Sequence, residues 1–322
     1  MKIVAVEKRN TDGYDIFRIP EIICTSKGSL IAYCECRMTG ADWAPIDIGM
    51  RKSTDGGVTW SERKILVYGK GETVNNPVMF SDKDEITLLY QHMYSRTFVC
   101  KSFDDGDTWS EPVEITESLK TPAYPYTVIA CGPGHGIVLS NGRYITPVWL
   151  ALNPEDPKAH WPSIISTIYS DDKGKTWAMG ELIQNDFLKN PSETTIVEIN
   201  QKTMLNIRNA CSIKKRAIAY SDDGISGWHD FRYAEELTDP TCAAGMIGVD
   251  NKIYFVNCRH ETIRTNLTLS ESNDFGQTWQ DLCLVAENAG YSDIASISPK
   301  QVAIYYENHG MELYIAVVDL PD

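Results

Sequence analysis

The sequence predicts an all-β protein, a six-bladed β-propeller whose blades are four-stranded antiparallel sheets. One observation is a short motif, S-x-D-x-G-x-T-W, that recurs with a spacing close to fifty residues. Another is a series of short alternating runs rich in Val, Ile, Tyr and Thr, separated by Gly, Asp, Asn and Pro, without long helical periodicity. At about 51 residues per blade, the chain corresponds to six blades, and we interpret residues 1–322 as one domain.

The recurring motif is expected to form a turn and a packing contact. Ser and Asp side chains accept backbone N–H bonds, Gly adopts positive φ, and Trp buries a large ring. Repeated aspartates of this kind serve the backbone rather than catalysis. The fourth copy along the chain, Ser221-Asp-Asp-Gly-Ile-Ser-Gly-Trp228, has Ile225 and Gly227 where Gly and Thr are expected, so we interpret it as a weakened turn. The four full copies begin at Ser53, Ser102, Ser170 and Ser272.

Short strands are expected along the whole chain, and two segments, 151–161 and 184–191, are expected to be irregular. The first strand, near Ile3, should pair with the last, at 313–318, because closing the ring removes exposed edges. The clearest strand patterns lie at 3–6, 29–33, 86–90, 144–148, 204–207 and 253–256.

Composition excludes several classes of protein. The net charge of −14 argues against nucleic acid as a partner, since polyanions are bound by Lys and Arg. The sequence contains no apolar run of 18 residues, so no membrane span is predicted. Residues 1–9 lack the apolar segment of a signal peptide, and we therefore expect a cytoplasmic protein. The nine cysteines include no C-x-x-C pair and are expected to be buried free thiols. We therefore expect no metal and no cofactor, and the oligomeric state stays open.

An insertion lengthens the interval between the second and third motifs to 68 residues. It contains Gly132-Pro-Gly-His-Gly136, which is either a plain tight turn or a loop that brings His135 to a ligand.

Four arginines lie beside apolar strands in this acidic chain: Arg18, Arg37, Arg208 and Arg264. A half-buried guanidinium needs partners. One interpretation is salt bridges between blades, and the other is a cluster that binds a carboxylate through paired N–H donors.

The chain resembles a known family. Phe17-Arg-Ile-Pro20, the four full motifs, G-P-G-x-G and Tyr291-Ser-Asp-Ile294 are similar to features of the bacterial sialidases (exo-α-neuraminidases), which are six-bladed propellers. The similarity covers nearly the whole chain. It implies a retaining exo-sialidase that hydrolyses terminal α-linked sialic (nonulosonic) acids of a sialylated glycan, with no nucleic acid or membrane partner.

The resemblance also implies roles for individual residues. Arg18, Arg208 and Arg264 match the three arginines that bind the substrate carboxylate. Arg37 matches a further arginine after the second strand of the first blade, and Glu307 matches the glutamate that braces Arg18.

Three residues match the catalytic groups of the family: Tyr291 the nucleophile, Glu193 its base, and Asp42 the acid/base. A neutral phenol avoids the repulsion that a carboxylate nucleophile would meet at an anomeric carbon that itself bears a carboxylate. Asp47 is the alternative acid and Glu198 the alternative base, although Glu198 falls within a strand pattern.

The pocket for the substituents of the sugar is less well marked. Asn76 stands where many members of the family carry an aspartate, so the preferred sugar stays open. Met79 is expected to contact the substrate, and packing in the core is the alternative for each candidate. The candidates are Met79, Phe80, Tyr124, Tyr126 and Trp149.

Two other functions remain as alternatives. A propeller that binds acidic sugars without cleaving them would need the arginines but not Asp42, Glu193 and Tyr291 together. An intramolecular trans-sialidase, or a hydrolase for a related acid sugar, would use the same residues for a different product.

Overall fold

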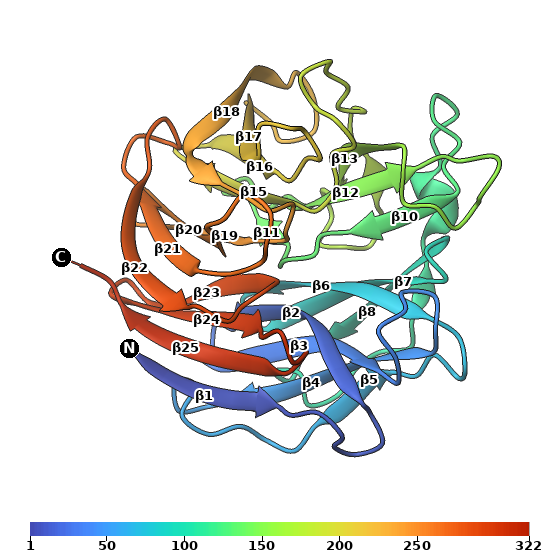
Figure 1. Ribbon diagram of the computed structural model, residues 1–322. Coiled ribbons are helices and arrows are strands. Elements are labelled where there is room, and N and C mark those ends of the chain that lie inside the picture. Colours follow the sequence, from blue (N-terminus) through green and yellow to red (C-terminus); the bar gives the residue numbers. More distant parts are fainter. Residues whose placement is uncertain (322) are drawn as a thin grey trace.

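Six β-sheets surround a central axis, and each places one of its two edge strands at the centre (Figure 1). The computed structural model describes residues 1–321. It contains 25 strands and a single short 3-10 helix, η1 (Thr116–Leu119), within those residues. The fold confirms the predicted six-bladed propeller of four-stranded antiparallel blades, one of which carries an additional short strand.

The first three blades follow one another in sequence, and in each the strands pair in antiparallel order from the centre outward. Their strands are β2 (Ile16–Cys24), β3 (Leu30–Arg37), β4 (Ile46–Ser53) and β5 (Lys64–Val67); β6 (Val74–Asp82), β7 (Glu85–His92), β8 (Arg96–Ser102) and β9 (Val113–Glu114); and β10 (Val128–Cys131), β11 (Ile137–Val138), β12 (Tyr144–Ala151), β13 (Ser163–Ser170) and β14 (Ala178–Met179). The additional strand β11 pairs with β12 and occupies part of the predicted insertion.

The last three blades repeat the pattern, but the sixth takes its outer strand from the beginning of the chain. Their strands are β15 (Thr194–Ile199), β16 (Lys202–Ile207), β17 (Lys215–Ser221) and β18 (His229–Thr238); β19 (Gly245–Val249), β20 (Lys252–Cys258), β21 (Leu267–Ser272) and β22 (Gln280–Ala286); and β23 (Ser292–Ser298), β24 (Gln301–Glu307), β25 (Leu313–Asp319) and β1 (Lys2–Glu7).

The ring is closed by pairing between β1 and β25, with Ile3 opposite Ala316 and Val4 opposite Ile315. This confirms the predicted pairing of the first and last strands, and Figure 1 shows the two running side by side. Because the outer strand of the sixth blade comes from the other end of the chain, the ring opens only if this pairing is lost.

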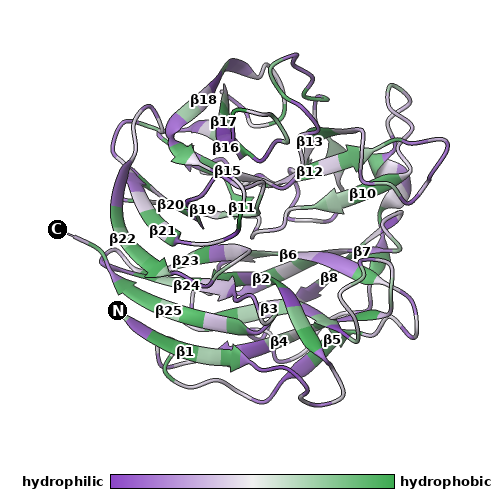
Figure 2. Cartoon of the chain, in the orientation of Figure 1, coloured by the Kyte–Doolittle hydropathy of each residue, from purple (hydrophilic) through white to green (hydrophobic). Residues whose placement is uncertain are grey.

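The core lies between neighbouring blades rather than at the axis. Apolar residues are concentrated in the strands (Figure 2), and they form six clusters, each built from two adjacent blades. Five clusters include the Trp of a recurring motif; these are Trp60, Trp109, Trp177, Trp228 and Trp279. The motif therefore contributes a wedge between blades, as its composition predicts.

The first motif shows how the turn is held. Ser53 Oγ accepts the backbone N–H of Gly57 at 2.9 Å, and Asp55 Oδ1 accepts that of Thr59 at 2.9 Å. The Thr59 hydroxyl donates to Asp55 Oδ2 at 2.6 Å, and Gly57 has φ +86°, where side chains with a Cβ are strained. Every polar residue of the motif is used by its own turn, which leaves these aspartates with a structural role.

The turn of the fourth motif, at Ser221, is shortened by one residue, which corrects its interpretation as a weakened turn. Gly224 donates its N–H to Ser221 Oγ at 3.0 Å and has the positive φ of +75°. Ser226 replaces the expected Thr, since its N–H and its hydroxyl donate to Asp223 at 2.8 Å. The same bonds therefore form within a loop that is one residue shorter.

Strand direction separates the two faces of the ring. In an antiparallel blade the inner strand begins, and the second strand ends, at one face, whereas the turn between the third and fourth strands lies at the other. The recurring motifs occupy those turns. Residues before inner strands and after second strands consequently gather at the opposite face, around the axis.

No helix in the part of the chain that the structure describes is long and apolar enough to cross a membrane. All nine cysteines are free thiols, and seven of them are buried.

Candidate active site

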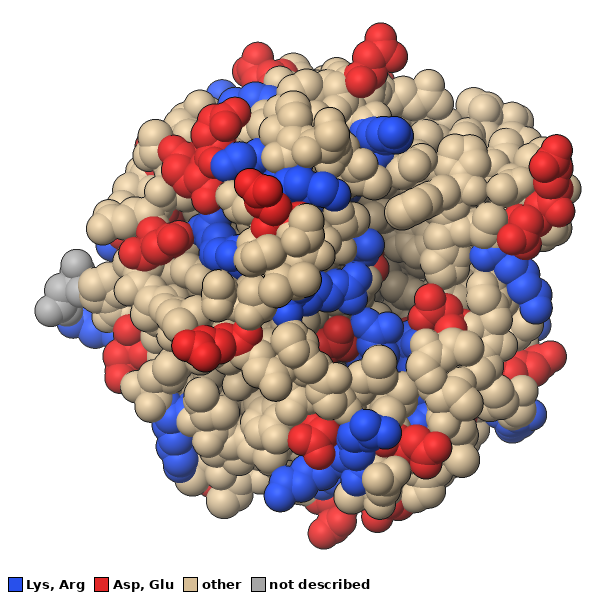
Figure 3. Space-filling model, viewed as in Figure 1, with Lys and Arg blue, Asp and Glu red and all other residues tan. Residues whose placement is uncertain are grey.

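A cavity of about 250 Å³ opens at the centre of the face opposite the recurring motifs. The space-filling view shows a hollow at the axis with Lys and Arg atoms inside it, in a molecule whose rim carries many acidic side chains (Figure 3). Four arginines and two carboxylates line the cavity together with aromatic and small polar residues. The lining is Arg18, Ile19, Arg37, Asp42, Asn76, Tyr94, Trp149, His160, Trp161, Ser192, Glu193, Arg208, Arg264 and Tyr291.

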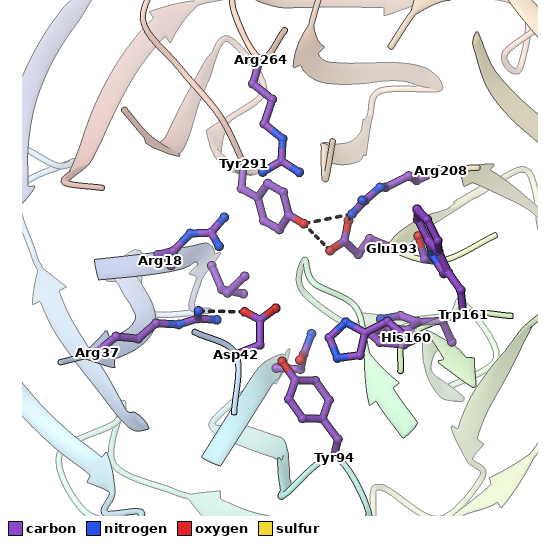
Figure 4. Close-up of a pocket in the computed structure, with 14 residues that line it drawn as sticks. Arg18, Arg37, Asp42, Tyr94, His160, Trp161, Glu193, Arg208, Arg264 and Tyr291 are labelled. Carbon is purple, nitrogen blue, oxygen red and sulfur yellow. Dashed lines mark hydrogen bonds and ion pairs between the residues drawn. The ribbon is translucent and has the colours of Figure 1, made fainter. Parts of the chain in front are cut away.

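The fold explains why residues so far apart in sequence meet here. Glu193 and Tyr291 each directly precede an inner strand, β15 and β23. Arg37 ends β3 and Arg208 directly follows β16, both second strands of their blades, while Arg264 lies in the loop that follows β20. All five positions thus belong to the same face, and their side chains point toward the axis (Figure 4).

Tyr291 is the centre of the polar network. Its phenol donates to Glu193 Oε1 at 2.5 Å and accepts a hydrogen bond from Arg208 Nη1 at 2.9 Å (Figure 4). Arg208 also forms an ion pair with the other carboxylate oxygen of Glu193. A carboxylate ready to accept the phenol proton and a cation beside the phenol oxygen are the two features that activate a weak nucleophile.

Three guanidinium groups surround the ring of Tyr291. The Cζ atoms of Arg264, Arg18 and Arg208 lie 4.7, 5.3 and 6.0 Å from the ring centroid. Such a concentration of positive charge in a chain of net charge −14 is a site for an anion.

The arginines differ in how far the protein already occupies them. Arg18 donates from Nε and Nη2 to the two oxygens of Glu307, at 3.2 and 3.0 Å. Burial would lower the pKa of Arg18, but the charge and hydrogen bonds of Glu307 outweigh it and raise the pKa above its ordinary value. Within residues 1–321, the guanidinium of Arg264 makes one long hydrogen bond, to the Thr241 carbonyl at 3.4 Å. Arg264 therefore has the most donors left for a ligand.

A second polar group lies across the cavity from Tyr291. Arg37 Nη1 donates to Asp42 Oδ1 at 2.8 Å, and the opposite side of the guanidinium binds Glu35, with 2.8 Å from Nε to Oε2. The side chain of Asp42 is 42 % exposed and faces the mouth of the cavity, whereas that of Arg37 is 1 % exposed. Burial lowers the pKa of Arg37, and the charge of Glu35 more than compensates, so the guanidinium stays charged.

The wall nearest Asp42 is aromatic. The ring of His160 lies 5.1 Å from those of both Tyr94 and Trp149, and Trp43 packs on Tyr94 at 4.8 Å, all between ring centroids. Burial lowers the pKa of His160, which keeps the imidazole neutral at pH 7. Trp161 is 52 % exposed at the rim. The sequence pointed to Trp149 in this wall but not to His160, Trp161 or Tyr94, because nothing in loops 93–95 and 152–162 predicts which side chains turn inward.

Most of the residues that the sequence singled out meet in this cavity. Arg18, Arg37, Arg208 and Arg264 line it, as do Asp42, Glu193 and Tyr291. Glu307 stands behind Arg18 and does not line the cavity.

Four of the expected substrate contacts lie elsewhere. Met79 is 0 % exposed and packs between the first two blades with Tyr33 and Leu88, so the expectation that it contacts a ligand was wrong. Asn76, three residues earlier on β6, lines the cavity instead, because the register of β6 against β7 shifts between Asn75 and Val78 and Asn76 has φ +48°. Phe80, Tyr124 and Tyr126 pack in the cluster between the second and third blades.

The two alternative carboxylates are placed away from the cavity. Asp47 accepts hydrogen bonds from the Tyr14 hydroxyl at 2.6 Å and the Gly69 N–H at 2.7 Å. Glu198 binds Ser140 through both oxygens.

His135 is likewise absent from the lining and binds a carboxylate inside the ring. Its Nδ1 lies 3.0 and 3.1 Å from the two oxygens of Asp293, which also accepts the Ile22 N–H at 3.0 Å. Asp293 thus connects the third, sixth and first blades just below Tyr291. Of the two interpretations of the Gly132–Gly136 loop, the structural one describes this geometry.

No group of three or more His, Cys, Asp or Glu side chains suited to a metal ion occurs among residues 1–321.

Comparisons with known proteins agree with this picture. A sialidase of Bacteroides fragilis (strain YCH46) is 28% identical across 99% of this chain and 65% of its own length. A sialidase of Paraclostridium sordellii is 27% identical across 96% of this chain and 86% of its own length. The chain therefore spans about two-thirds of the first relative and most of the second.

A solved structure, the Hadza microbial sialidase Hz136, superposes with a TM-score of 0.88 at 25% identity, covering 99% of this chain and 68% of that one. Residues 44–304 match the model of a family described as BNR repeat-like domain. The resemblance to the bacterial sialidases is thereby confirmed, and the chain belongs to the BNR repeat-like domain family.

Proposed function

We propose that this protein is a retaining exo-sialidase that hydrolyses terminal α-linked sialic acids of glycans. One observation carries the proposal: the phenol of Tyr291 donates to Glu193 at 2.5 Å while three guanidinium groups surround its ring. Sialidases from two bacteria resemble the chain over nearly its whole length, which supports the same conclusion.

The arginines select the substrate. Arg18, Arg208 and Arg264 converge on one side of the cavity, and guanidinium groups bind a carboxylate through paired N–H donors. Sialic acid carries a carboxylate on its anomeric carbon, so this contact would place the reacting carbon over Tyr291. The cavity of about 250 Å³ is slightly smaller than the usual range for ligand pockets, roughly 300–1,000 Å³, which suits one terminal sugar residue.

Each of the three catalytic side chains then takes part in a defined step of the reaction. Glu193 takes the phenol proton as the oxygen of Tyr291 attacks the anomeric carbon, and Asp42 gives a proton to the leaving oxygen. Asp42 next takes a proton from a water molecule, whose oxygen attacks the same carbon. The bond between that carbon and the Tyr291 oxygen breaks, the electron pair goes to the phenol oxygen, and Glu193 gives its proton back to that oxygen. Two displacements at one carbon retain its configuration.

The proposal is tested with the purified protein and 4-methylumbelliferyl sialoside, followed by identification of the product by NMR. We expect free sialic acid, released first as the α-anomer. A 2,3-difluorosialic acid should label Tyr291, which peptide mass spectrometry detects. Binding of sialic acid without turnover or label would identify an acidic-sugar-binding propeller, and an anhydro sugar as product would identify an intramolecular trans-sialidase; either result overturns the proposal.

A further inference from the structure

Glu35 is a buried carboxylate to which no step of the proposed reaction assigns a role. It lies on β3, two residues before Arg37, so both side chains point to the same side of the strand. The side chain is 0 % exposed. Its Oε2 accepts from Arg37 Nε at 2.8 Å and also from Nη2, and its Oε1 accepts the N–H of Asn76, on β6 of the next blade, at 2.9 Å.

Arg37 therefore stands between two carboxylates. Its Nε and Nη2 face Glu35, and its Nη1 donates to Asp42 Oδ1 at 2.8 Å. One positive charge is shared by two negative ones. A guanidinium has donors along its whole edge, so both contacts form without competing for the same N–H.

The sharing of the Arg37 charge matters because Asp42 has to donate a proton in the proposed reaction. A carboxyl that donates a proton must first carry one, and an unshared cation at 2.8 Å would favour its ionised form. An arginine that is already neutralised on its other side orients the carboxyl while opposing protonation less strongly.

We propose that Glu35 is a positioning residue for the reaction, which holds Arg37 in the cavity wall and neutralises it so that Asp42 is oriented yet still able to carry a proton. The inference rests on the proposed function, in which Asp42 is the acid/base. Glu35 does not touch the cavity itself and acts through Arg37.

Other groups also face Asp42, and they set the background against which Glu35 acts. Arg18 on β2 and Arg37 on β3 contribute positive charges, and His160 and Tyr94 contribute neutral polar groups from the third and second blades. Of these four groups, Arg37 is the one whose hydrogen bonds to Glu35 the structure shows.

A purely structural ion pair is the alternative, because Glu35 also joins two blades through Asn76. Removing one partner of a buried pair is destabilising wherever it lies. The two roles are separated by the pH dependence of the rate, which a structural pair does not change. Glu7 supplies a matched control: its side chain is 2 % exposed and it binds Arg51 and Arg63, at 2.9 Å and 2.6 Å, without lining the cavity.

The experiment compares wild type, Glu35→Gln and Glu7→Gln by measuring kcat/KM against pH with sialyllactose and with 4-methylumbelliferyl sialoside. In Glu35→Gln we expect the basic limb of the profile of kcat/KM against pH to move to lower pH. At neutral pH, kcat/KM for sialyllactose should fall about tenfold. The aryl sialoside, whose leaving group departs with less help, should lose about two- to threefold. Glu7→Gln should keep the wild-type profile.

If Glu35→Gln does not fold, Glu35→Asp tests the inference instead. This variant keeps the negative charge, so the basic limb of its pH profile should stay at the wild-type pH. A moved limb in Glu35→Asp, or a folded Glu35→Gln with an unmoved limb, would overturn the inference. Failure of the proposed function looks different: wild type would lack turnover, or Asp42→Asn would retain full activity with sialyllactose.

Discussion

Tyr291 and Glu193, which are 98 positions apart in the sequence, share a hydrogen bond of 2.5 Å at the axis of the propeller. Each directly precedes the inner strand of its blade, and two blades meet at the centre only once the ring is formed. The hydrogen bond between the proposed nucleophile and its proposed base therefore forms only when the ring is closed.

The first prediction concerns that pair. Tyr291→Phe removes the attacking oxygen but keeps the ring that the three arginines surround. We expect kcat to fall by several powers of ten while the affinity for sialic acid, measured by calorimetry, changes less than tenfold. Retention of more than a tenth of the wild-type kcat would exclude Tyr291 as the nucleophile.

The second prediction concerns the binding of the substrate carboxylate by Arg264. Arg264→Lys replaces the guanidinium that has the most unused donors with an ammonium that cannot bind both oxygens in one plane. A hydrogen bond to a charged group contributes about 1.5–3 kcal/mol, so kcat/KM should fall roughly ten- to a hundredfold. Arg96→Lys, at an exposed pair with Glu114, is the control and should have wild-type kinetics. Equal kinetics in all three proteins would remove Arg264 from the site.

The third prediction concerns the shortened motif. Asp223 accepts hydrogen bonds from the N–H groups of Ile225 and Ser226 and from the Ser226 hydroxyl, all at 2.8 Å. Asp223→Ala should therefore lower Tm by as much as Asp172→Ala does in a full motif, with kcat unchanged because both turns lie on the face opposite the cavity. Thermal unfolding of both variants measures Tm, and an assay of turnover measures kcat. A Tm within 1 °C or so of wild type for Asp223→Ala alone would restore the interpretation as a weakened turn.

The fourth prediction concerns the stability of the protein at low pH. Hydrogen bonds from Thr59, first through its hydroxyl and then its N–H, lower the pKa of Asp55 from 3.8 to about 2. The corresponding bonds in the next two motifs lower the pKa of Asp104 and Asp172 to about 2 as well. Since these carboxyls bind protons more weakly in the folded state, they stabilise the protein above pH 3.8, and that contribution disappears as the pH falls toward 2.

Urea unfolding at pH 5, 4, 3 and 2.5 tests this directly. We expect the midpoint to fall steeply below pH 4 in wild type and less steeply in Asp172→Asn. Asp84→Asn, at an exposed turn between β6 and β7, should follow the wild-type curve. Parallel curves for all three proteins would show that the motif aspartates do not contribute.

The fifth prediction concerns metals. Full activity is expected after dialysis against EDTA, because the cavity offers guanidinium groups where a metal site would need several anionic or imidazole ligands. Activity that disappears and returns with added Ca²⁺ or Mg²⁺ would contradict this.

The sequence by itself determined the architecture. Motifs about fifty residues apart specify the number of blades, because each turn uses all of its own polar groups and each Trp needs a neighbouring blade to bury it. The pairing of β1 with β25 also followed, since a propeller without it would keep exposed edges. The spacing of the arginines is equally consistent with salt bridges between blades, and it is the resemblance to the sialidases that assigns the arginines and Tyr291 to one site.

Only the tertiary structure decided which side chains face the cavity. Met79 and Asn76 lie three residues apart on β6 and both are buried, but an irregularity in the register brings only Asn76 to the lining of the cavity. His160 enters from a loop, and Glu35 meets both Arg37 and the neighbouring blade. Local patterns describe which face of a strand is apolar, but contacts at the axis join six blades that are distant in sequence, and the direction of each side chain there depends on how those blades pack.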